Sequence, residues 1–406
     1  MNELEDLLRD AAPQVLGLLL RRYGSGQFDL CEDAVSEAML ATHEQWQRDG
    51  LPDSPIGWLT TAARRRLIDR LRSDARRRER ELTDARLAHP LAEQAFDEQA
   101  GRHDDSLQVL MLCCHPGLPR SAQVALTLRA VGGLSTAQIA RGYLLPEATI
   151  AQRISRAKAK IRDNTAGFPA VTDPTARLDP VLTVLYLMFT EAHTASSGES
   201  LYDVDLAREA IRLTEGVHRA LPDHGETAGL LALMLLTDAR RSARLDDHGR
   251  MVPLDEQDRT LWDRSKIDRG TALLRRTLPG RPPSPYLIQA SIAALHAEAA
   301  SAALTDWSEI LALYGILERL TDNPVVTLNR AVAAAMVGGP EVGLRIVDEL
   351  GDRLPSDDHR RLAVHAHLLE RAGRSSAREA YLEASKRTDS IAERDYLRSR
   401  ARRLQR

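Results

Sequence analysis

The sequence has few aromatic residues and few cysteines. Tryptophan, tyrosine and phenylalanine make up 4% of the 406 residues, and there are three cysteines. Because β-sheet cores are rich in aromatic and β-branched side chains, this composition, with its abundant Ala, Leu, Arg and Glu, predicts an all-α protein. An odd number of cysteines without metal-ligand spacing argues against a disulfide framework and favours a reducing, cytoplasmic location.

Long apolar runs and catalytic motifs are missing as well. The longest apolar run, VLTVLYLMF at 181–189, is much shorter than the roughly 20 residues that cross a bilayer. The first ten residues, MNELEDLLRD, are acidic and lack the organisation of a signal peptide. No glycine-rich phosphate loop and no nucleophile–base arrangement is recognisable. We therefore expect no membrane contact, no cofactor and no enzymatic activity.

The net charge is close to neutral, so any contact with nucleic acid has to come from a local basic surface. The formal net charge is −3, and a chain of 406 residues is long enough for two or three domains. The charges are distributed unevenly along the chain. That unevenness predicts where partners bind.

The first predicted domain, residues 1–80, pairs an acidic helix with a basic one. Residues 30–46, LCEDAVSEAMLATHEQW, place Asp33 and Glu37 four apart on an outer helical face. Pro55 begins the next helix, in which Trp58 points inward and is favoured as a core residue over a stacking platform. The outer face of that helix carries a run of arginines: Arg64, Arg65, Arg66, Arg70, Arg72 and Arg76 to Arg78.

A linker at 81–106 is predicted to precede a second domain at 107–165, which ends in a helix-turn-helix. Ser135 and Gln138 form a capping box, and Pro146 begins a second helix with Ile150 and Ile154 inward. Its predicted outward residues, candidates for contact with DNA bases and phosphates, are Thr149, Gln152, Arg153, Arg156, Lys158 and Lys160. The same pattern also fits a solvated helix with basic residues near its C-terminus.

The sequence CCHP at 113–116 invites a zinc hypothesis, which we reject. Adjacent cysteines do not easily supply two tetrahedral ligands, and there is no second cysteine pair. Cys113 and Cys114 are instead predicted to be small buried residues, and no metal site is expected.

Three motifs in this order resemble the extracytoplasmic-function group of bacterial RNA polymerase sigma factors. Residues 31–46 are similar to the polymerase-binding segment, residues 54–72 to the segment that engages the −10 promoter element, and residues 126–162 to the −35-reading domain. One departure is the turn RGYLLPEAT, which lacks the glycine that many relatives carry before Leu-Pro.

The resemblance implies roles for individual residues. Asp33 and Glu37 would face the β′ clamp of core RNA polymerase, whose β subunit is also an expected partner. Arg64, Arg65, Arg70 and Arg72 would hold the −10 DNA, and the loop at 47–55 would receive a base flipped from the non-template strand. The second helix of the helix-turn-helix would read the −35 element.

The rest of the chain, 178–406, is predicted to be a helical domain with tetratricopeptide-like repeats. A shift of 34 residues superposes Gly339 on Gly373, Gly343 on Ala377, Val347 on Tyr381 and Leu350 on Ala384. The segments YLMFTEAH, ALMLLTDARRSAR, DRTLWDRSKI and AALHAEA resemble the subgroup of these sigma factors that has a fused C-terminal helical domain. Such a domain would regulate the factor or bind a protein partner.

Two other functions stay open at this point. One is a polymerase-independent helix-turn-helix activator with a helical-repeat sensor, and the other is a repeat scaffold that never touches DNA. The acidic helix with Asp33 and Glu37 favours the sigma factor over the activator, because an activator does not need it. The arginine run at 64–78 argues against the scaffold.

Overall fold

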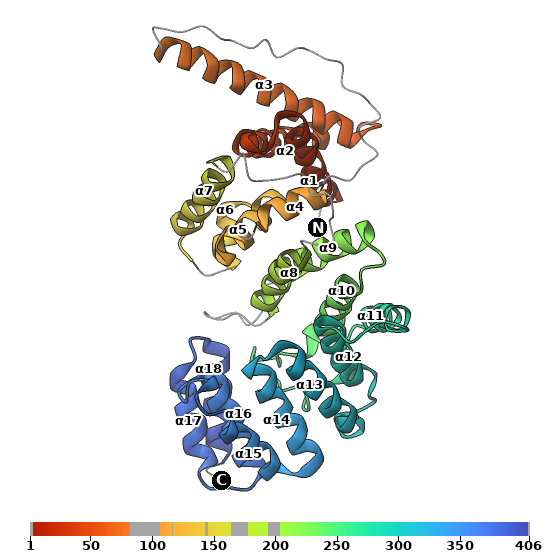
Figure 1. Cartoon of the computed structure of the whole chain (residues 1–406), viewed down its shortest axis with the longest axis vertical. Helices are drawn as coiled ribbons and strands as arrows, with labels where there is room; N and C mark the ends of the chain where they lie inside the picture. Colours follow the sequence, from red (N-terminus) through yellow and green to blue (C-terminus); the bar gives the residue numbers. More distant parts are fainter. Residues whose placement is uncertain are drawn as a thin grey trace. The chain divides into compact units, whose positions relative to one another are not determined.

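The computed structural model of the chain describes residues 3–81, 106–115, 117–142, 145–163, 178–193 and 204–404. Within these ranges the regular elements are helices, and one isolated antiparallel bridge joins Leu245 to Met251. The all-α prediction is therefore confirmed. None of the described helices is both long enough and apolar enough to cross a membrane. The chain divides into two compact units, residues 1–185 and 186–406 (Figure 1).

The first unit contains both predicted sigma-like segments. Its helices are α1 Glu3–Tyr23, α2 Phe28–Asp49, α3 Pro55–Glu81, α4 Ser106–Cys113, α5 Arg120–Ala130, α6 Thr136–Gly142 and α7 Glu147–Asp163, with a short 3-10 turn, η1 Ser25–Gln27. α8 Leu178–His193 begins in this unit and ends in the second. Residues 82–105 of the predicted linker and 164–177 of the junction lie outside the described residues.

α1, α2 and α3 bury a shared apolar core. Leu16, Phe28, Leu59 and Leu67 are almost fully buried where the three helices meet. The Trp58 ring lies edge-on to the Trp46 ring, with 5.6 Å between ring centroids. Trp58 is therefore packed against the core, as the sequence indicates, and the acidic and basic helices stay adjacent.

α6 and α7 form the predicted helix-turn-helix. The backbone N–H of Gln138 donates to Oγ of Ser135 over 3.1 Å, and the Ser135 N–H donates to Oε1 of Gln138 over 2.8 Å. This reciprocal pair is the predicted capping box. Ile150 and Ile154 are buried, as expected, and they hold α7 against α5 and α6.

The second unit is built of helices packed in chain order. They are α9 Val204–Ala220, α10 Gly225–Asp238, α11 Arg264–Thr277, α12 Pro285–Glu298, α13 Trp307–Thr321, α14 Pro324–Gly338, α15 Pro340–Glu349, α16 His359–Arg371, α17 Ala377–Arg387 and α18 Ile391–Arg403. Successive apolar clusters join α10 to α12, α12 to α14, α14 to α16 and α16 to α18. Each cluster shares a helix with the next, so the unit has a continuous core.

Glycine allows two of these helix pairs to approach closely. A Cβ on Gly229 of α10 would come within 2.7 Å of the backbone nitrogen of Leu287 on α12. A Cβ on Gly343 of α15 would come within 2.6 Å of the carbonyl oxygen of Ala331 on α14. These two contacts therefore need a residue without a side chain.

The 34-residue match corresponds to two helix pairs, α14–α15 and α16–α17. Gly339 lies between α14 and α15, and Gly373 lies between α16 and α17. Both have positive φ angles, 91° and 67°. The superposed positions in α15, α17 and the turn after α15 are buried: Gly343, Val347, Leu350, Ala377, Tyr381 and Ala384. The helix pairs repeat as predicted, and their assignment to the tetratricopeptide class stays a prediction.

Candidate functional site

Four carboxylates lie along one side of α2, and we call Asp29, Glu32, Asp33 and Glu37 the acidic cluster. Their spacing of three and four residues places them on neighbouring turns of the same helical face. Glu32 is only 2% exposed, whereas Glu37 is exposed to solvent. A buried carboxylate needs partners, and these come from both sides of the helix.

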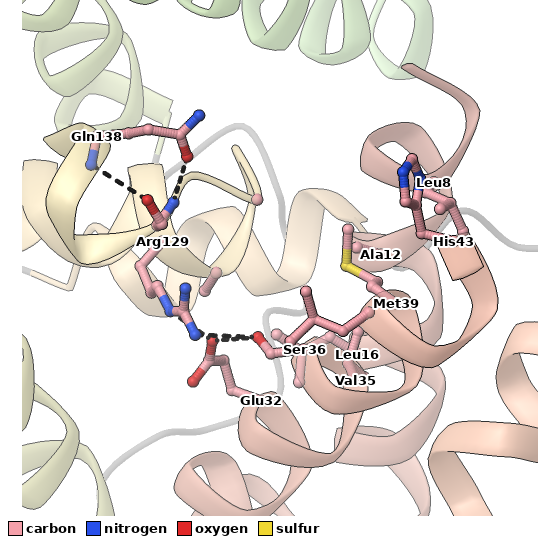
Figure 2. A pocket seen from close by; sticks show the side chains of 14 residues that line it. Leu8, Ala12, Leu16, Glu32, Val35, Ser36, Met39, His43, Arg129 and Gln138 are labelled. Carbon is pink, nitrogen blue, oxygen red and sulfur yellow. Dashed lines mark hydrogen bonds and ion pairs between the residues drawn. The ribbon is translucent and has the colours of Figure 1, made fainter. Parts of the chain in front are cut away.

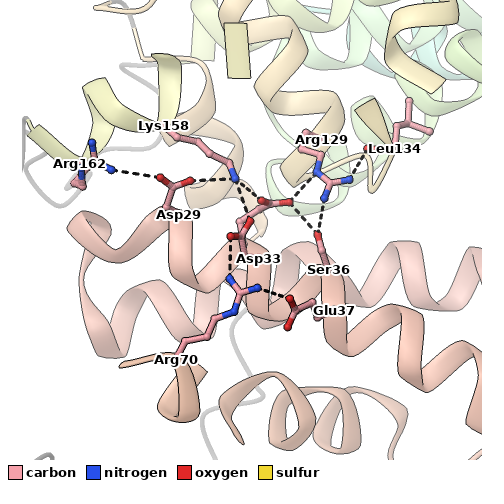
Figure 3. Close-up of polar contacts among 10 residues, drawn as sticks. Asp29, Asp33, Ser36, Glu37, Arg70, Arg129, Leu134, Lys158 and Arg162 are labelled. Atoms are coloured by element: carbon pink, nitrogen blue, oxygen red, sulfur yellow. Dashed lines mark hydrogen bonds and ion pairs between the residues drawn. The ribbon is translucent and has the colours of Figure 1, made fainter. Parts of the chain in front are cut away.

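Lys158 of α7 is the central partner of the acidic cluster (Figure 3). Its Nζ lies 2.6 Å from Oε2 of Glu32, 3.1 Å from Oδ1 of Asp29 and 3.4 Å from Oδ1 of Asp33. The lysine is 8% exposed, so its charge is balanced by carboxylates rather than by water. The helix that should read DNA is thereby tied to the helix that should bind polymerase.

Arg129 of α5 makes a second connection to the same carboxylate. Its Nε lies 3.0 Å from Oε1 of Glu32, and its guanidinium also donates over 3.3 Å to Oγ of Ser36 and to the carbonyl oxygen of Leu134. Figure 3 shows the contacts of Arg129 with Ser36 and Leu134. Both oxygens of Glu32 are thus paired with cations. We call the contact of Lys158 and Arg129 with α2 the closed arrangement.

Arg70 of α3 pairs with the other end of the acidic cluster. It donates from Nη1 to Oδ2 of Asp33 over 2.9 Å, and from Nη2 to Oε1 of Glu37. Arg70 is one of the predicted −10 contacts, and Asp33 and Glu37 are the predicted polymerase contacts. The structure brings the two sets of residues together.

The ion pairs shift the pKa values of the groups that form them. Burial by itself would raise the pKa of Asp33, but the charge of Lys158 and the hydrogen bond from Arg70 outweigh it, so the pKa is lowered. Burial would lower the pKa of Lys158, and the charges of Glu32, Asp33 and Asp29 raise it instead. Asp33 and Lys158 are therefore both charged at neutral pH.

A crevice of about 390 Å³ lies beside these ion pairs, between α1 and α2 on one side and α5 and α6 on the other (Figure 2). The α1–α2 side of its lining combines apolar residues such as Leu16 and Met39 with the polar residues Glu32, Ser36 and His43. The other side includes Arg129 and Gln138. The contact between the two halves of the unit is therefore incompletely packed at this crevice.

The predicted DNA-reading residues of α7 differ in exposure. Gln152, Arg156 and Lys160 are exposed, and Thr149 and Arg153 are partly buried. The expectation that Lys158 points outward is wrong, because the lysine is buried against α2. The spacing already contained the signal: Lys158 follows Ile150 and Ile154 at intervals of four residues and so continues the inward face.

The predicted −10 residues also differ among themselves. Arg65 and Arg72 are exposed on α3, Arg64 and Arg70 are partly buried, and the loop at 47–55 is largely exposed. The side chains of Arg76 to Arg78 lie outside the described residues.

Cys113 and Cys114 are buried, as expected, and the Cys114 sulfur lies 3.6 Å from Oγ1 of Thr127.

The sequence prediction missed Asp29, Glu32, Ser36 and Arg129. Asp29 and Glu32 share the face of Asp33 and Glu37, so helical spacing could have included them. Arg129 carries no such signal, because its partners Glu32 and Ser36 are about 95 residues away in the sequence.

Three known families match parts of the chain. Residues 7–77 match Sigma-70 region 2, and residues 108–161 match Sigma-70, region 4. Residues 177–278 match a family described as "Family of unknown function (DUF6596)". No solved structure matches the chain.

A relative from Rhizobium meliloti (strain 1021), with the name Uncharacterized protein R00370, is 41% identical over 401 residues. The match covers 96% of this chain and 93% of the relative.

A helix-turn-helix joined to a region 2 fold defines a transcription initiation factor. The chain belongs to the sigma-70 family, as an extracytoplasmic-function sigma factor with a fused C-terminal domain.

Proposed function

We propose that this protein binds core RNA polymerase, directs it to promoters with −35 and −10 elements, and promotes melting of DNA near the start site. Region 2 would contact the polymerase clamp through the acidic cluster and the −10 DNA through Arg64, Arg65, Arg70 and Arg72. Region 4 would read the −35 element through Thr149, Gln152, Arg153 and Arg156, with Lys160 on a phosphate. Because its proposed partners are polymerase and promoter DNA, the protein would act in the cytoplasm.

The observation that carries this proposal is the combination of an acidic α2 and a helix-turn-helix within one unit that matches both sigma regions. α7 presents Gln152 and Arg156 to solvent while its isoleucines are buried. An amide and a guanidinium on one helical face are the groups that read base edges in the major groove. A polymerase-independent activator remains the second candidate, because the same face could read an operator.

We further propose that the closed arrangement is a resting state. Lys158 and Arg129 cover Glu32, and Lys158 also contacts Asp33, so part of the acidic cluster is already paired within the chain. A basic surface of the polymerase would compete with these two cations for the same carboxylates. Exchange of one set of ion pairs for another would release α7 from α2 and make Lys158 available to DNA.

Run-off transcription with purified core polymerase tests the function. Addition of the protein should give a defined start site on promoters enriched by selection with the holoenzyme, and neither component should do so alone. A gel-shift assay without polymerase provides the contrast. Sequence-specific binding of the protein alone, with no effect on the start site, would favour the activator and overturn the sigma proposal.

The C-terminal unit would regulate this activity or bind a protein partner. Support comes from its separate core and from its match to a family different from the sigma regions. The tetratricopeptide-like assignment would give it a concave surface suited to a helix or peptide.

A further inference from the structure

The second unit contains a cavity of about 480 Å³ that no role in sigma function explains. Residues from α8, α10, α12, α13 and α14 line it, together with Arg240, which follows α10. Cavities of roughly 300–1,000 Å³ are typical of small-molecule sites. The volume is far larger than an inorganic ion needs.

Arg240 is the one residue with a permanent charge among the described residues that line this cavity, and no aspartate or glutamate is among them. Its guanidinium has no hydrogen bond or ion pair with the described part of the chain. The nearest carboxylate in sequence, Asp238, is taken by Lys266 at 2.6 Å and by Arg241 at 3.7 Å.

The surroundings of Arg240 are cationic and poorly hydrated. Burial, together with the charges of Arg244 and Arg259, lowers the pKa of its guanidinium to about 10. Arg259 donates hydrogen bonds over 2.6 Å each to the backbone carbonyl oxygens of His296 and Ala299, which hold it in place. Because these partners are neutral, Arg259 adds positive charge without an anion. A cation in such a place is costly unless an anion joins it.

The other polar groups of the cavity are neutral at physiological pH. Burial, with the charges of Arg240 and Arg259, lowers the pKa of His296 to about 4. Burial raises the pKa of Tyr314 to about 12. The imidazole and the phenol can therefore form hydrogen bonds to a ligand, but neither can neutralise Arg240.

Aromatic and apolar side chains make up much of the remaining wall. The rings of Tyr186 and Tyr286 lie 5.5 Å apart between centroids, and Leu233, Ile292 and Val326 add aliphatic surface. Such a wall suits the organic body of a ligand, and Arg240 suits its charged end.

We infer that this cavity is a binding site for a small organic anion, in which Arg240 pairs with a carboxylate or phosphate group and the tyrosines pack against the rest of the ligand. The site lies within the C-terminal unit and does not depend on the sigma proposal. A ligand bound there would give the fused unit a chemical signal to which it can respond.

Binding to the full-length protein, without polymerase or DNA, tests the inference. The probes are benzoate and phenyl phosphate, and their uncharged matches are benzamide and phenol. Both anions should raise the melting temperature of the protein and give saturation-transfer NMR signals, and the uncharged matches should bind at least tenfold more weakly. Equal binding of charged and uncharged probes, or binding of neither anion, would overturn the inference.

Variants separate a binding role of Arg240 from a structural one. Arg240→Gln should lower affinity for both anions at least tenfold. Without ligand it should melt at the same temperature as the parent or higher, because an unpaired, partly buried cation is removed. Arg345→Gln, an exposed arginine of α15, should change neither property. A lower melting temperature of ligand-free Arg240→Gln would show that Arg240 supports the fold, and unchanged affinity would show that it does not bind the anions. Either result would overturn the inference.

Discussion

The ammonium group of Lys158 lies 2.6 Å from a carboxylate oxygen of Glu32, across 126 residues of sequence. Glu32 belongs to region 2, and Lys158 belongs to α7 of region 4. Both side chains are almost fully buried. The pair therefore connects the two functional halves of the sigma factor directly.

Removal of one partner of this pair should open the closed arrangement. Lys158→Met leaves Glu32 with Arg129 only, and breaking a buried ion pair costs about 3–5 kcal/mol. Fluorescence energy transfer between dyes on Gln47→Cys and Ser121→Cys should report a larger distance in the variant. The native cysteines Cys31, Cys113 and Cys114 are buried, which favours labelling at the introduced sites.

Lys160→Met is the matched control for this experiment. It removes the same charge from an exposed position of α7 and should leave energy transfer unchanged. If Lys158→Met and Lys160→Met give the same distance as the parent, the ion pair does not hold the two regions together.

Reversal of charge at Glu37 should weaken binding to core polymerase. Glu37→Lys places a cation opposite the basic clamp surface, and we expect a loss of about tenfold, or ~1.4 kcal/mol, in a fluorescence binding assay without DNA. Asp69→Lys makes the same change at an exposed position of α3 and should have little effect. Equal losses in both variants would indicate a nonspecific charge effect.

The elements of the sigma regions could be predicted from sequence because each has a local signal. The capping box at Ser135 and Gln138, the apolar spacing of Ile150 and Ile154, and Pro55 at a helix start all depend on residues a few positions apart. Their predicted positions agree with the structure.

The closed arrangement could not be predicted in the same way. Arg129 is an unremarkable residue near the end of a helix, and its pairing with Glu32 depends on how two regions pack. The sequence pattern counts Lys158 among the outward residues of α7, although its spacing from Ile154 places it inward. The charge of a residue is a weaker guide to its direction than its helical position, provided that a partner of opposite charge faces it.

Substitutions on the exposed face of α7 should separate base reading from phosphate contact. Gln152→Ala or Arg153→Ala should reduce the free energy of promoter binding by about 1–3 kcal/mol and relax the base preference at one −35 position. Lys160→Ala should weaken binding to all promoters alike and reduce the salt dependence by about one phosphate contact. Promoter selection with each variant holoenzyme measures both effects. An unchanged −35 preference after both base-reading substitutions would contradict the assignment.

The C-terminal unit should lose stability in mild acid. Burial and neighbouring arginines lower the pKa of His193 to about 2 and that of His296 to about 4, from an ordinary value of 6.5. Below pH 6.5 these histidines take up protons in the unfolded chain but stay neutral in the folded unit. The free energy of unfolding that they contribute is therefore complete above pH 6.5 and is lost as the pH falls toward the folded pKa values. At pH 5 each histidine should lower the free energy of unfolding by about 2 kcal/mol.

Hydrogen exchange of α12 at pH 5 and pH 7.5, corrected for the intrinsic rate, measures this loss. His296→Asn should remove about half of it, and His248→Asn, at an exposed turn, should leave it unchanged. A stability of α12 that does not depend on pH in the parent would contradict the buried neutral state of His296.

The fragment 166–406 should fold without the sigma regions. Its apolar clusters run from α10 to α18 and are formed by residues of this part of the chain. The boundary between the two compact units falls within α8, between Leu185 and Tyr186, so a cut there would divide a helix. A start at 166 keeps α8 whole. Circular dichroism should show a helical fragment with a cooperative melting transition, and a disordered fragment would contradict the prediction.

The complementary fragment 1–165 should bind core polymerase but give less transcription than the full chain. It keeps the acidic cluster, the closed arrangement and the helix-turn-helix, which are formed by residues 29–162. We expect a loss of activity rather than release from inhibition, because a large helical array is better suited to docking a partner than to covering a site. Run-off transcription with equal amounts of holoenzyme, checked by a polymerase-binding assay, measures the difference. Output from 1–165 identical to that of the full chain would mean that the C-terminal unit does not act on the sigma regions.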